Sequence, residues 1–148
     1  MQVRCTGQAL RDARGFTLVE LLVVLLLLGI LAMIALPSFI GQRAKGQDSE
    51  AESMVRTAHT ALRTYEMDHD TFDATRADLE EIEPAIGEAS AAFDVVDGTT
   101  TTFTIIERSD SDTVFTLTRD GSGRMTRGCS PASRGLCRSA VDADGNRW

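Results

Sequence analysis

The first half of the chain has a long apolar run. Residues 21–36 read LLVVLLLLGILAMIAL, and with its flanks the run exceeds about 20 residues, enough to span the hydrocarbon core of a bilayer. A cleavable secretory signal normally has a shorter apolar core followed by a small-residue cleavage site, and neither feature is found here. We therefore expect any cleavage to precede the apolar segment.

Helical periodicity continues beyond this run. Apolar side chains recur at spacings of three, four and seven, at Ala44, Ala51, Met54, Val55, Ala58, Leu62 and Tyr65. The intervening positions are polar: Gln47, Asp48, Glu50, Glu52, Arg56 and Arg63. The pattern predicts an amphipathic helix with one apolar stripe, ending near residues 67–70 and continuous with the apolar run as one helix of about 50 residues. Gly29 and Pro37 interrupt the apolar part, and Pro37 predicts a kink.

A connector over residues 71–92 follows the helix. Within it, residues 75–78 read TRAD and lead into LEEIE, a pattern that predicts a short capped helix, which Pro84 ends. The polar sequence DHDTFD, before this short helix, marks the end of the long one.

The pattern then changes to period two. Residues 101–107 (TTFTIIE) and 113–119 (TVFTLTR) predict strands joined by an SDSD turn. We expect Phe103 and Ile105 of the first, with Phe115 and Leu117 of the second, to share one face. After a DGSG turn, residues 124–127 predict a short third strand, and residues 93–96 are a candidate for a fourth. The predicted fold is α+β, with a long N-terminal helix packed against an antiparallel sheet of three to four strands.

Charge is distributed unevenly along this pattern. The net charge is −7, but residues 1–15 carry three arginines and one aspartate. The remainder has twelve basic and twenty-one acidic residues, a net charge of −9, which argues against direct nucleic-acid binding. A basic flank before the apolar run predicts that the N-terminus stays in the cytoplasm and the acidic body crosses the membrane.

Three cysteines divide between these regions. Cys5 lies in the basic flank, whereas Cys129 and Cys137 lie close together in the acidic body. An even number of cysteines in the body suits a disulfide in an oxidising compartment, worth about 2.5 kcal/mol by chain entropy. Free buried thiols or a metal site are the alternatives, although this spacing without a nearby histidine does not match a zinc pattern.

A glutamate stands inside the start of the apolar segment. Residues 14–22 read RGFTLVELL, and Glu20 is the only charged residue among residues 16–42. A charge at the bilayer centre costs roughly 2.5 kcal/mol or more, so something must compensate for this carboxylate or use it. A signal anchor with an incidental glutamate at the membrane edge is the ordinary alternative.

The ordered set Gly15, Phe16, Thr17, Leu18 and Glu20, followed by Gly29 and Pro37, resembles the N-terminus of type IV prepilins. The resemblance is close over the first 40 or so residues and looser in the strand region, where TFTLTRDGSGRMTRGCSPASRGLC resembles the sheet and cysteine-closed loop of pilin heads. It implies the type IV pilin fold. It further divides the chain into a leader (1–15), a transmembrane and filament-core helix (16–40), an amphipathic helix (41–70), and a connector, sheet and disulfide loop (71–148).

The resemblance also implies a processing event. A prepilin peptidase would cleave between Gly15 and Phe16, where the missing side chain of glycine allows close approach of catalytic groups, and would methylate the new amine of Phe16. Cys5 would leave with the leader. Glu20, one helical turn from that amine, would pair with its own N-terminus or with that of a neighbouring subunit, the second being the arrangement that the family favours. Gly29 and Pro37 would then bracket a segment that unwinds on assembly, or a fixed kink.

The expected function is a structural subunit of a type IV pilus-like filament. The expected partners are further copies of the chain, the prepilin peptidase, an assembly platform protein with its ATPase motor, and minor pilins. The prepilin would sit in the inner membrane as a single-pass protein and reach the cell surface on assembly. The alternatives are a pseudopilin of a type II secretion or DNA-uptake system, and an anchored binding module that never polymerises.

Other candidate chemistry is weak. His59 and His69 do not share a helix face and are predicted to be solvated. Asp142 and Asp144 resemble a fragment of a calcium loop without its bidentate glutamate, so a flexible polar tail is the preferred interpretation. We expect no enzyme activity and no cofactor, since neither a nucleophile motif nor a phosphate loop is found.

Overall fold

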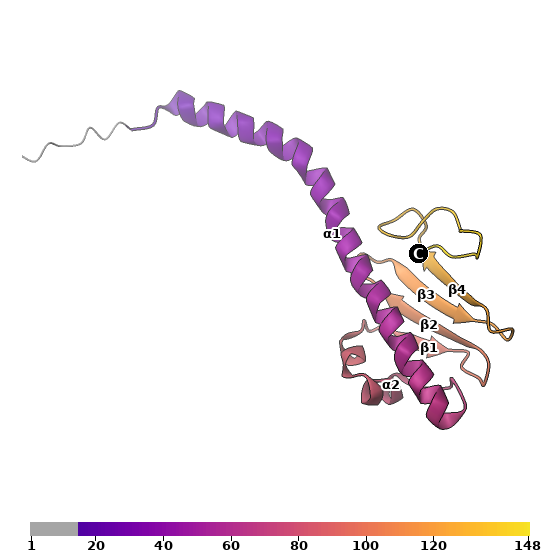
Figure 1. Ribbon diagram of the computed structural model, residues 1–148. Coiled ribbons are helices and arrows are strands. Elements are labelled where there is room, and N and C mark those ends of the chain that lie inside the picture. Colours follow the sequence, from indigo (N-terminus) through magenta and orange to yellow (C-terminus); the bar gives the residue numbers. More distant parts are fainter. Residues whose placement is uncertain (1–14) are drawn as a thin grey trace, which may run out of the picture. The chain divides into compact units, whose positions relative to one another are not determined.

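The computed structural model describes residues 15–148, so the predictions for residues 1–14, Cys5 included, concern residues outside the described part. Its elements follow in the order α1, α2, η1 and four strands (Figure 1). The helix α1, Leu18–His69, has 52 residues, as the periodicity predicts. The chain divides into two compact units, whose described parts are residues 15–38 and Phe39–Trp148.

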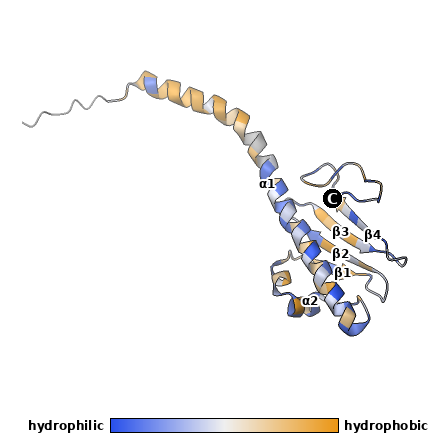
Figure 2. Ribbon diagram, viewed as in Figure 1, coloured by the Kyte–Doolittle hydropathy of each residue, from blue (hydrophilic) through white to orange (hydrophobic). Residues whose placement is uncertain are grey.

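The described part of the first unit is an apolar helical segment. Leu18–Ala35 has a mean hydropathy of 3.0 and is long and apolar enough to cross a membrane. Its large side chains are exposed, from 44% at Val24 to 77% at Met33. Figure 2 shows this part of α1 almost uniformly hydrophobic. Burying this surface is favourable, so the segment needs a lipid or protein environment.

The second unit begins in α1 and buries one stripe of it. Ala51, Val55, Ala58, Ala61 and Leu62 are 5% exposed or less, with Met54 and Tyr65 partly buried beside them. These positions are three, four or seven residues apart, so they fall on one helix face. The predicted amphipathic stripe is confirmed for this part of α1.

The connector folds as two short helices. The first, α2, is Arg76–Ile82, and η1, a 3-10 helix, is Pro84–Glu88. Thr75 caps α2 through a capping box with Asp78, as the TRAD sequence suggests. Arg76 stabilises the turn that follows by donating to the carbonyl oxygens of Ile86, Gly87, Ala89 and Ser90.

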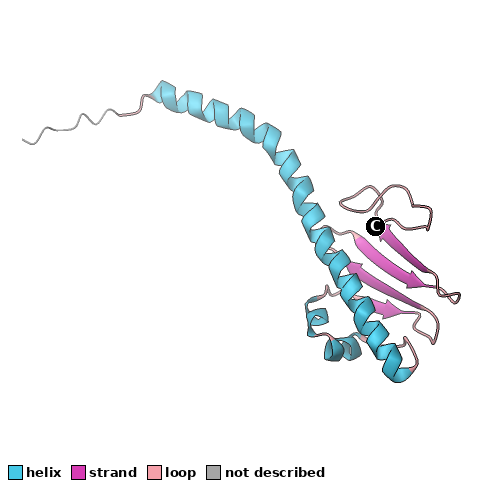
Figure 3. Cartoon of the chain, viewed as in Figure 1, coloured by secondary structure: helices cyan, strands magenta, loops and turns pink. Residues whose placement is uncertain are grey.

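Four strands form one antiparallel sheet in the order β1-β2-β3-β4 (Figure 3). The strands are β1 Asp94–Val96, β2 Phe103–Arg108, β3 Val114–Arg119 and β4 Met125–Ser130. Each pairs with its chain neighbour, because short turns connect them. The prediction of three to four antiparallel strands is confirmed.

The core lies on the sheet face occupied by Phe103, Ile105, Phe115 and Leu117, all 5% exposed or less. This is the face that the alternating pattern predicts. Phe72, which follows α1, packs against Phe103 with ring centroids 4.9 Å apart. The core is therefore made of the α1 stripe, the inner sheet face and the connector.

The segment after β4 corrects the prediction of a flexible polar tail. Trp148 is 8% exposed, lies edge-on to Phe115 at 5.8 Å and donates its indole N–H to the carbonyl of Gly128. The backbone N–H of Arg147 donates to the carbonyl of Arg127. The polar composition of this segment predicts flexibility, but the buried Trp148 side chain and a few hydrogen bonds to β4 hold the segment in place.

Asp48 corrects a second prediction, since the periodicity places it on the polar face. It is 0% exposed, and its carboxylate accepts hydrogen bonds from the Ser111 hydroxyl and, at 2.8 Å, from the backbone N–H of Leu136. Ser111 follows β2, and Leu136 belongs to the loop that the two cysteines close. A buried carboxylate requires such donors, which lie 63 and 88 residues away in the chain.

Asp48→Ala should destabilise the second unit by about 1–3 kcal/mol, because the buried Ser111 hydroxyl and the half-buried Leu136 N–H lose their acceptor. Denaturant unfolding of the detergent-solubilised chain, followed by fluorescence of the single, buried Trp148, measures the change. Glu50→Ala, at an exposed position two residues away, is the control and should change stability by less than about 0.5 kcal/mol. Equal effects of the two substitutions would contradict this account.

His59 corrects a third prediction, because it is half-buried rather than solvated. Its ring lies 5.7 Å from that of Phe103. Burial lowers the pKa of His59 below its ordinary 6.5, and the charges of Arg63, Arg127 and Arg119 lower it further. His69 is exposed, as expected, and stacks on Tyr65.

The lowered pKa of His59 predicts a pH dependence of stability. Below pH 6.5 the unfolded chain gains this proton before the folded chain does, so the His59 contribution to stability falls as pH drops from 6.5 toward the folded pKa. We expect the free energy of unfolding of His59→Gln minus that of wild type to stay constant above pH 6.5 and to increase as pH is lowered below 6.5. A difference that is constant at all pH values would contradict the assignment.

Candidate functional site: residues 15–20 and the head loops

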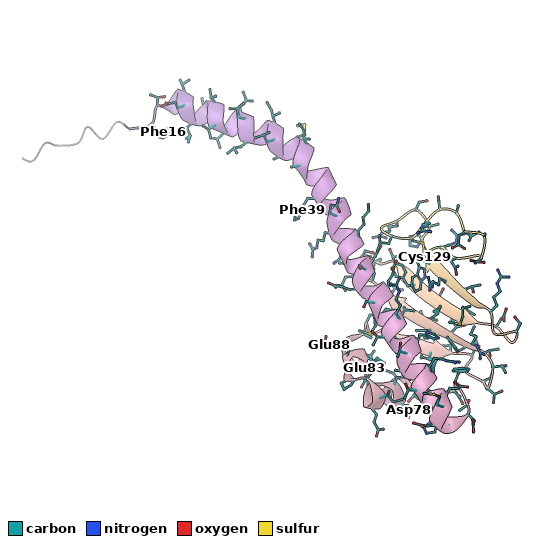
Figure 4. All side chains as sticks on the ribbon, in the orientation of Figure 1. Phe16, Phe39, Asp78, Glu83, Glu88 and Cys129 are labelled. Atoms are coloured by element: carbon teal, nitrogen blue, oxygen red, sulfur yellow. A yellow bond between two sulfur atoms is a disulfide. The ribbon has the colours of Figure 1, made fainter. Side chains whose placement is uncertain are left out.

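Gly15, Phe16, Thr17 and Glu20 occupy the start of the apolar segment. Gly15 has open space around it, since no atom lies within 4 Å of where a side chain would begin. Phe16 is 79% exposed (Figure 4). The Gly15–Phe16 bond precedes the first helical residue, Leu18, so it lies outside the helix.

Glu20 is held by Thr17. Its Oε2 accepts hydrogen bonds from the backbone N–H of Thr17 at 3.2 Å and from its hydroxyl at 3.1 Å. In return the Thr17 hydroxyl oxygen accepts from the backbone N–H of Glu20 at 3.2 Å. This reciprocal pattern is that of a capping box, which satisfies N–H groups otherwise unpaired at a helix start.

This role of Thr17 was not predicted, although the T-x-x-E spacing that signals a capping box is present in the sequence. The carboxylate at the helix N-terminus also interacts favourably with the helix dipole. Glu20 is therefore partly compensated within its own chain. Any use of this charge in assembly exchanges those contacts for others, so the relevant energy is a difference between two partly satisfied states.

Gly29 and Pro37 both lie within α1. Gly29 has open space around it. A kink at Pro37, a segment that unwinds on assembly, and the domain boundaries at residues 15, 40 and 70 stay predictions.

Cys129 and Cys137 form a disulfide, with their Cα atoms 5.6 Å apart. Cys129 is in β4, so the bond ties the following loop to the sheet. Gly135 in that loop has φ +55° and lies so close to Asp48 that a side chain there would collide with the carboxylate. The loop is thus fixed at one end by the disulfide and near Leu136 by Asp48.

Asp142 and Asp144 lie in a turn whose polar groups bond to one another. The Asp142 carboxylate accepts from the backbone N–H groups of Asp144 and Asn146, and its pKa is lowered chiefly by the Asn146 N–H. The carbonyl of Asp144 accepts from Arg124. Within residues 15–148 no group of three or more histidine, cysteine, aspartate or glutamate side chains is arranged to hold a metal.

Comparison with known proteins bears on these residues. The model of the prokaryotic N-terminal methylation motif matches residues 10–36, which include Gly15, Phe16 and Glu20. A ComG operon protein 3 homolog of Bacillus licheniformis is 36% identical over 69 residues, 47% of this chain and 71% of that protein.

The chain belongs to the type IV pilin and pseudopilin superfamily.

The chain is also similar to one pilus protein and to one type II secretion protein of this superfamily. The type IV wide pilus major component PilA4 of Thermus thermophilus is 27% identical over 106 residues, 72% of this chain and 81% of that protein. The type II secretion system core protein G of Pectobacterium carotovorum is 34% identical over 73 residues, 49% of this chain. The chain spans 47% of that protein's length. The α+β architecture is consistent with the pilin fold of this superfamily.

Proposed function

We propose that this pilin-family chain is a structural subunit of a type IV pilus-like filament, assembled from many copies through their N-terminal helices. The exposed apolar surface of Leu18–Ala35 is the observation that carries the proposal. Van der Waals packing holds apolar helices together as well as lipid does, so the same side chains suit a bilayer before assembly and neighbouring helices afterwards. No catalytic chemistry is required.

Processing prepares the subunit for assembly. A prepilin peptidase cleaves after Gly15 and methylates Phe16, which leaves a mature chain of 133 residues with a charged amine at its start. The open surroundings of Gly15 and Phe16 support access by an enzyme. Before cleavage the subunit crosses the inner membrane once with its N-terminus in the cytoplasm, since the basic leader precedes the apolar segment.

Glu20 then directs assembly. The new amine of Phe16 lies about one helical turn from Glu20 along the chain, and the amine of an adjacent subunit offers the carboxylate a charge-assisted partner in a medium of low dielectric constant. The Thr17 contacts hold the carboxylate at the helix start until that partner arrives. An assembly platform protein, its ATPase motor and minor pilins complete the machinery, and the filament reaches the cell surface.

A second candidate is a pseudopilin, the subunit of a periplasmic filament in type II secretion or DNA uptake. The similarity to a type II secretion system core protein G favours it. The N-terminal features serve both candidates. The place where the filament is found, cell surface or periplasm, distinguishes them.

Glu20→Gln separates the two roles of Glu20, because glutamine retains an oxygen that can cap the helix but carries no charge. If charge pairing directs assembly, Glu20→Gln and Glu20→Ala should both reduce sheared filaments by about tenfold or more, while membrane levels stay near wild type. Electron microscopy and immunoblots of sheared and membrane fractions measure this. Normal filaments from Glu20→Gln would reject the pairing role, and normal filaments from Glu20→Ala would reject any assembly role.

Mass spectrometry of the mature protein tests processing. We expect an N-terminus at Phe16 that carries one added methyl group. Gly15→Val should leave the leader attached, because a branched side chain blocks the close approach that glycine permits. A mature protein that still begins at Met1 would contradict the cleavage assignment.

A further inference from the structure

Charge is polarised across the second unit. Residues 66–97 carry eleven acidic side chains and one arginine. Residues 121–148 carry five arginines and two aspartates. We define the α2 acidic surface as the acidic residues of α2 and η1, which are Asp78, Glu80, Glu81, Glu83 and Glu88. We define the β4 arginine surface as Arg124, Arg127, Arg134, Arg138 and Arg147.

The fold separates these two surfaces. The α2 acidic surface belongs to the connector that precedes β1, and β1 and β4 are opposite edges of the sheet. In Figure 4, Asp78, Glu83 and Glu88 lie on one side of this unit and Cys129 of β4 lies on the other.

Hydrogen bonds hold the β4 arginine surface together. The Arg147 N–H donates to the carbonyl of Arg127, and the Arg138 N–H donates to that of Arg147. The Arg127 guanidinium lies 5.5 Å from the centre of the Trp148 ring, and Arg124 donates to the Asp144 carbonyl. These contacts fix the backbone and some guanidinium groups without neutralising their charge, so the surface stays positive.

Few ion pairs within the unit neutralise either surface. On the α2 acidic surface Glu80 pairs with Arg76 at 2.8 Å, while Glu81 and Glu88 are exposed and form no ion pair within residues 15–148. On the β4 arginine surface Arg134 reaches Asp112 only at 4.0 Å, and Arg138 is exposed with no ion pair in the same range. Both surfaces are therefore open to an external partner of opposite charge.

The backbone groups of Arg127, in the middle of the β4 edge, are already paired within the chain. The segment that ends in Trp148 covers this edge, because Arg127 and Gly128 already use their carbonyls as acceptors for Arg147 and Trp148. The Arg127 N–H donates to Asn146. At Arg127 a partner would therefore bind through side chains, and the arginines around it make charge a means of recognition.

We propose that the β4 arginine surface of one subunit docks on the α2 acidic surface of a second copy of this chain, an inference that rests on the proposed filament function. A helical filament of identical subunits needs heterologous contacts, in which two different surfaces of the subunit meet. Two separated surfaces of opposite charge supply such a pair. They also replace some of the repulsion between bodies of net charge −9 with attraction and exclude like-charged orientations.

A nucleic acid is the competing partner for an arginine surface. Asp142 and Asp144 lie within the same segment as the arginines, and the whole body is acidic, so phosphate chains would be repelled at longer range. A second copy, in contrast, brings the acidic surface that matches. The observations therefore favour the second copy.

Charge reversal tests the docking in cells whose native copy is replaced. Arg134→Glu with Arg138→Glu reverses one surface, and Glu81→Arg with Glu88→Arg reverses the other. Each pair should reduce sheared filaments by about tenfold at low salt, because several charge pairs are lost together. The four substitutions combined, which leave the net charge unchanged, should restore most of the yield. Glu50→Arg, at an exposed position of α1 outside both surfaces, is the control and should assemble normally.

The outcomes separate this proposal from the filament function. Absence of filaments from wild-type cells, on the surface and in the periplasm, would overturn both. Wild-type filaments with normal assembly of the two reversed pairs, or with no recovery in the fourfold variant, would overturn the docking alone. If Arg134→Glu with Arg138→Glu assembles normally but its sheared filaments lose retention of double-stranded DNA, the arginine surface binds nucleic acid and the docking proposal is wrong.

Discussion

The structure depends on one constraint, which is the length of the apolar surface that α1 presents in its two parts. The part that contains Ala51, Val55 and Leu62 is covered by the sheet, and this contact defines the core of the second unit. The part from Leu18 to Ala35 is long and apolar enough to cross a membrane, and its large side chains are exposed. Burial of such a surface in lipid or against other apolar helices is favourable, and membership of a filament-forming superfamily is the biological counterpart of this physical requirement.

At the start of α1, the Glu20 carboxylate must be tolerated in lipid and, in the proposed filament, among neighbouring helices. Glu20 is costly in lipid if it stands alone, but the hydroxyl and N–H of Thr17 and the helix dipole reduce that cost. If its own chain bound this carboxylate strongly, exchanging those contacts for a partner in another subunit would gain little free energy. Contacts of 3.1–3.2 Å with an exposed threonine are modest, so the proposed exchange of these contacts for the amine of a neighbouring subunit loses little.

Local patterns in the sequence predicted most of the fold. The spacing of Val55, Ala58 and Leu62 gave the helix face, and the alternation of Phe103 with Ile105 gave the buried face of the sheet, because both follow from the period of one element. Asp48 and Trp148 escaped prediction, since their burial depends on donors and rings many residues away. At the candidate site the motif predicts roles for Gly15, Phe16 and Glu20, and these stay predictions. The capping contact of Thr17 was not predicted, although its T-x-x-E spacing is a local pattern too.

The Asp48 carboxylate limits where foreign sequence can be inserted into the second unit. It joins α1, the turn after β2 and the loop between Cys129 and Cys137, so that loop is not an independent module. A foreign peptide grafted there would have to retain Gly135 and the Leu136 N–H, or leave a buried charge without donors. The turn at Gly121 and Ser122 is exposed and supplies no donor to a buried charge. It is therefore the better place to display an added epitope along a filament.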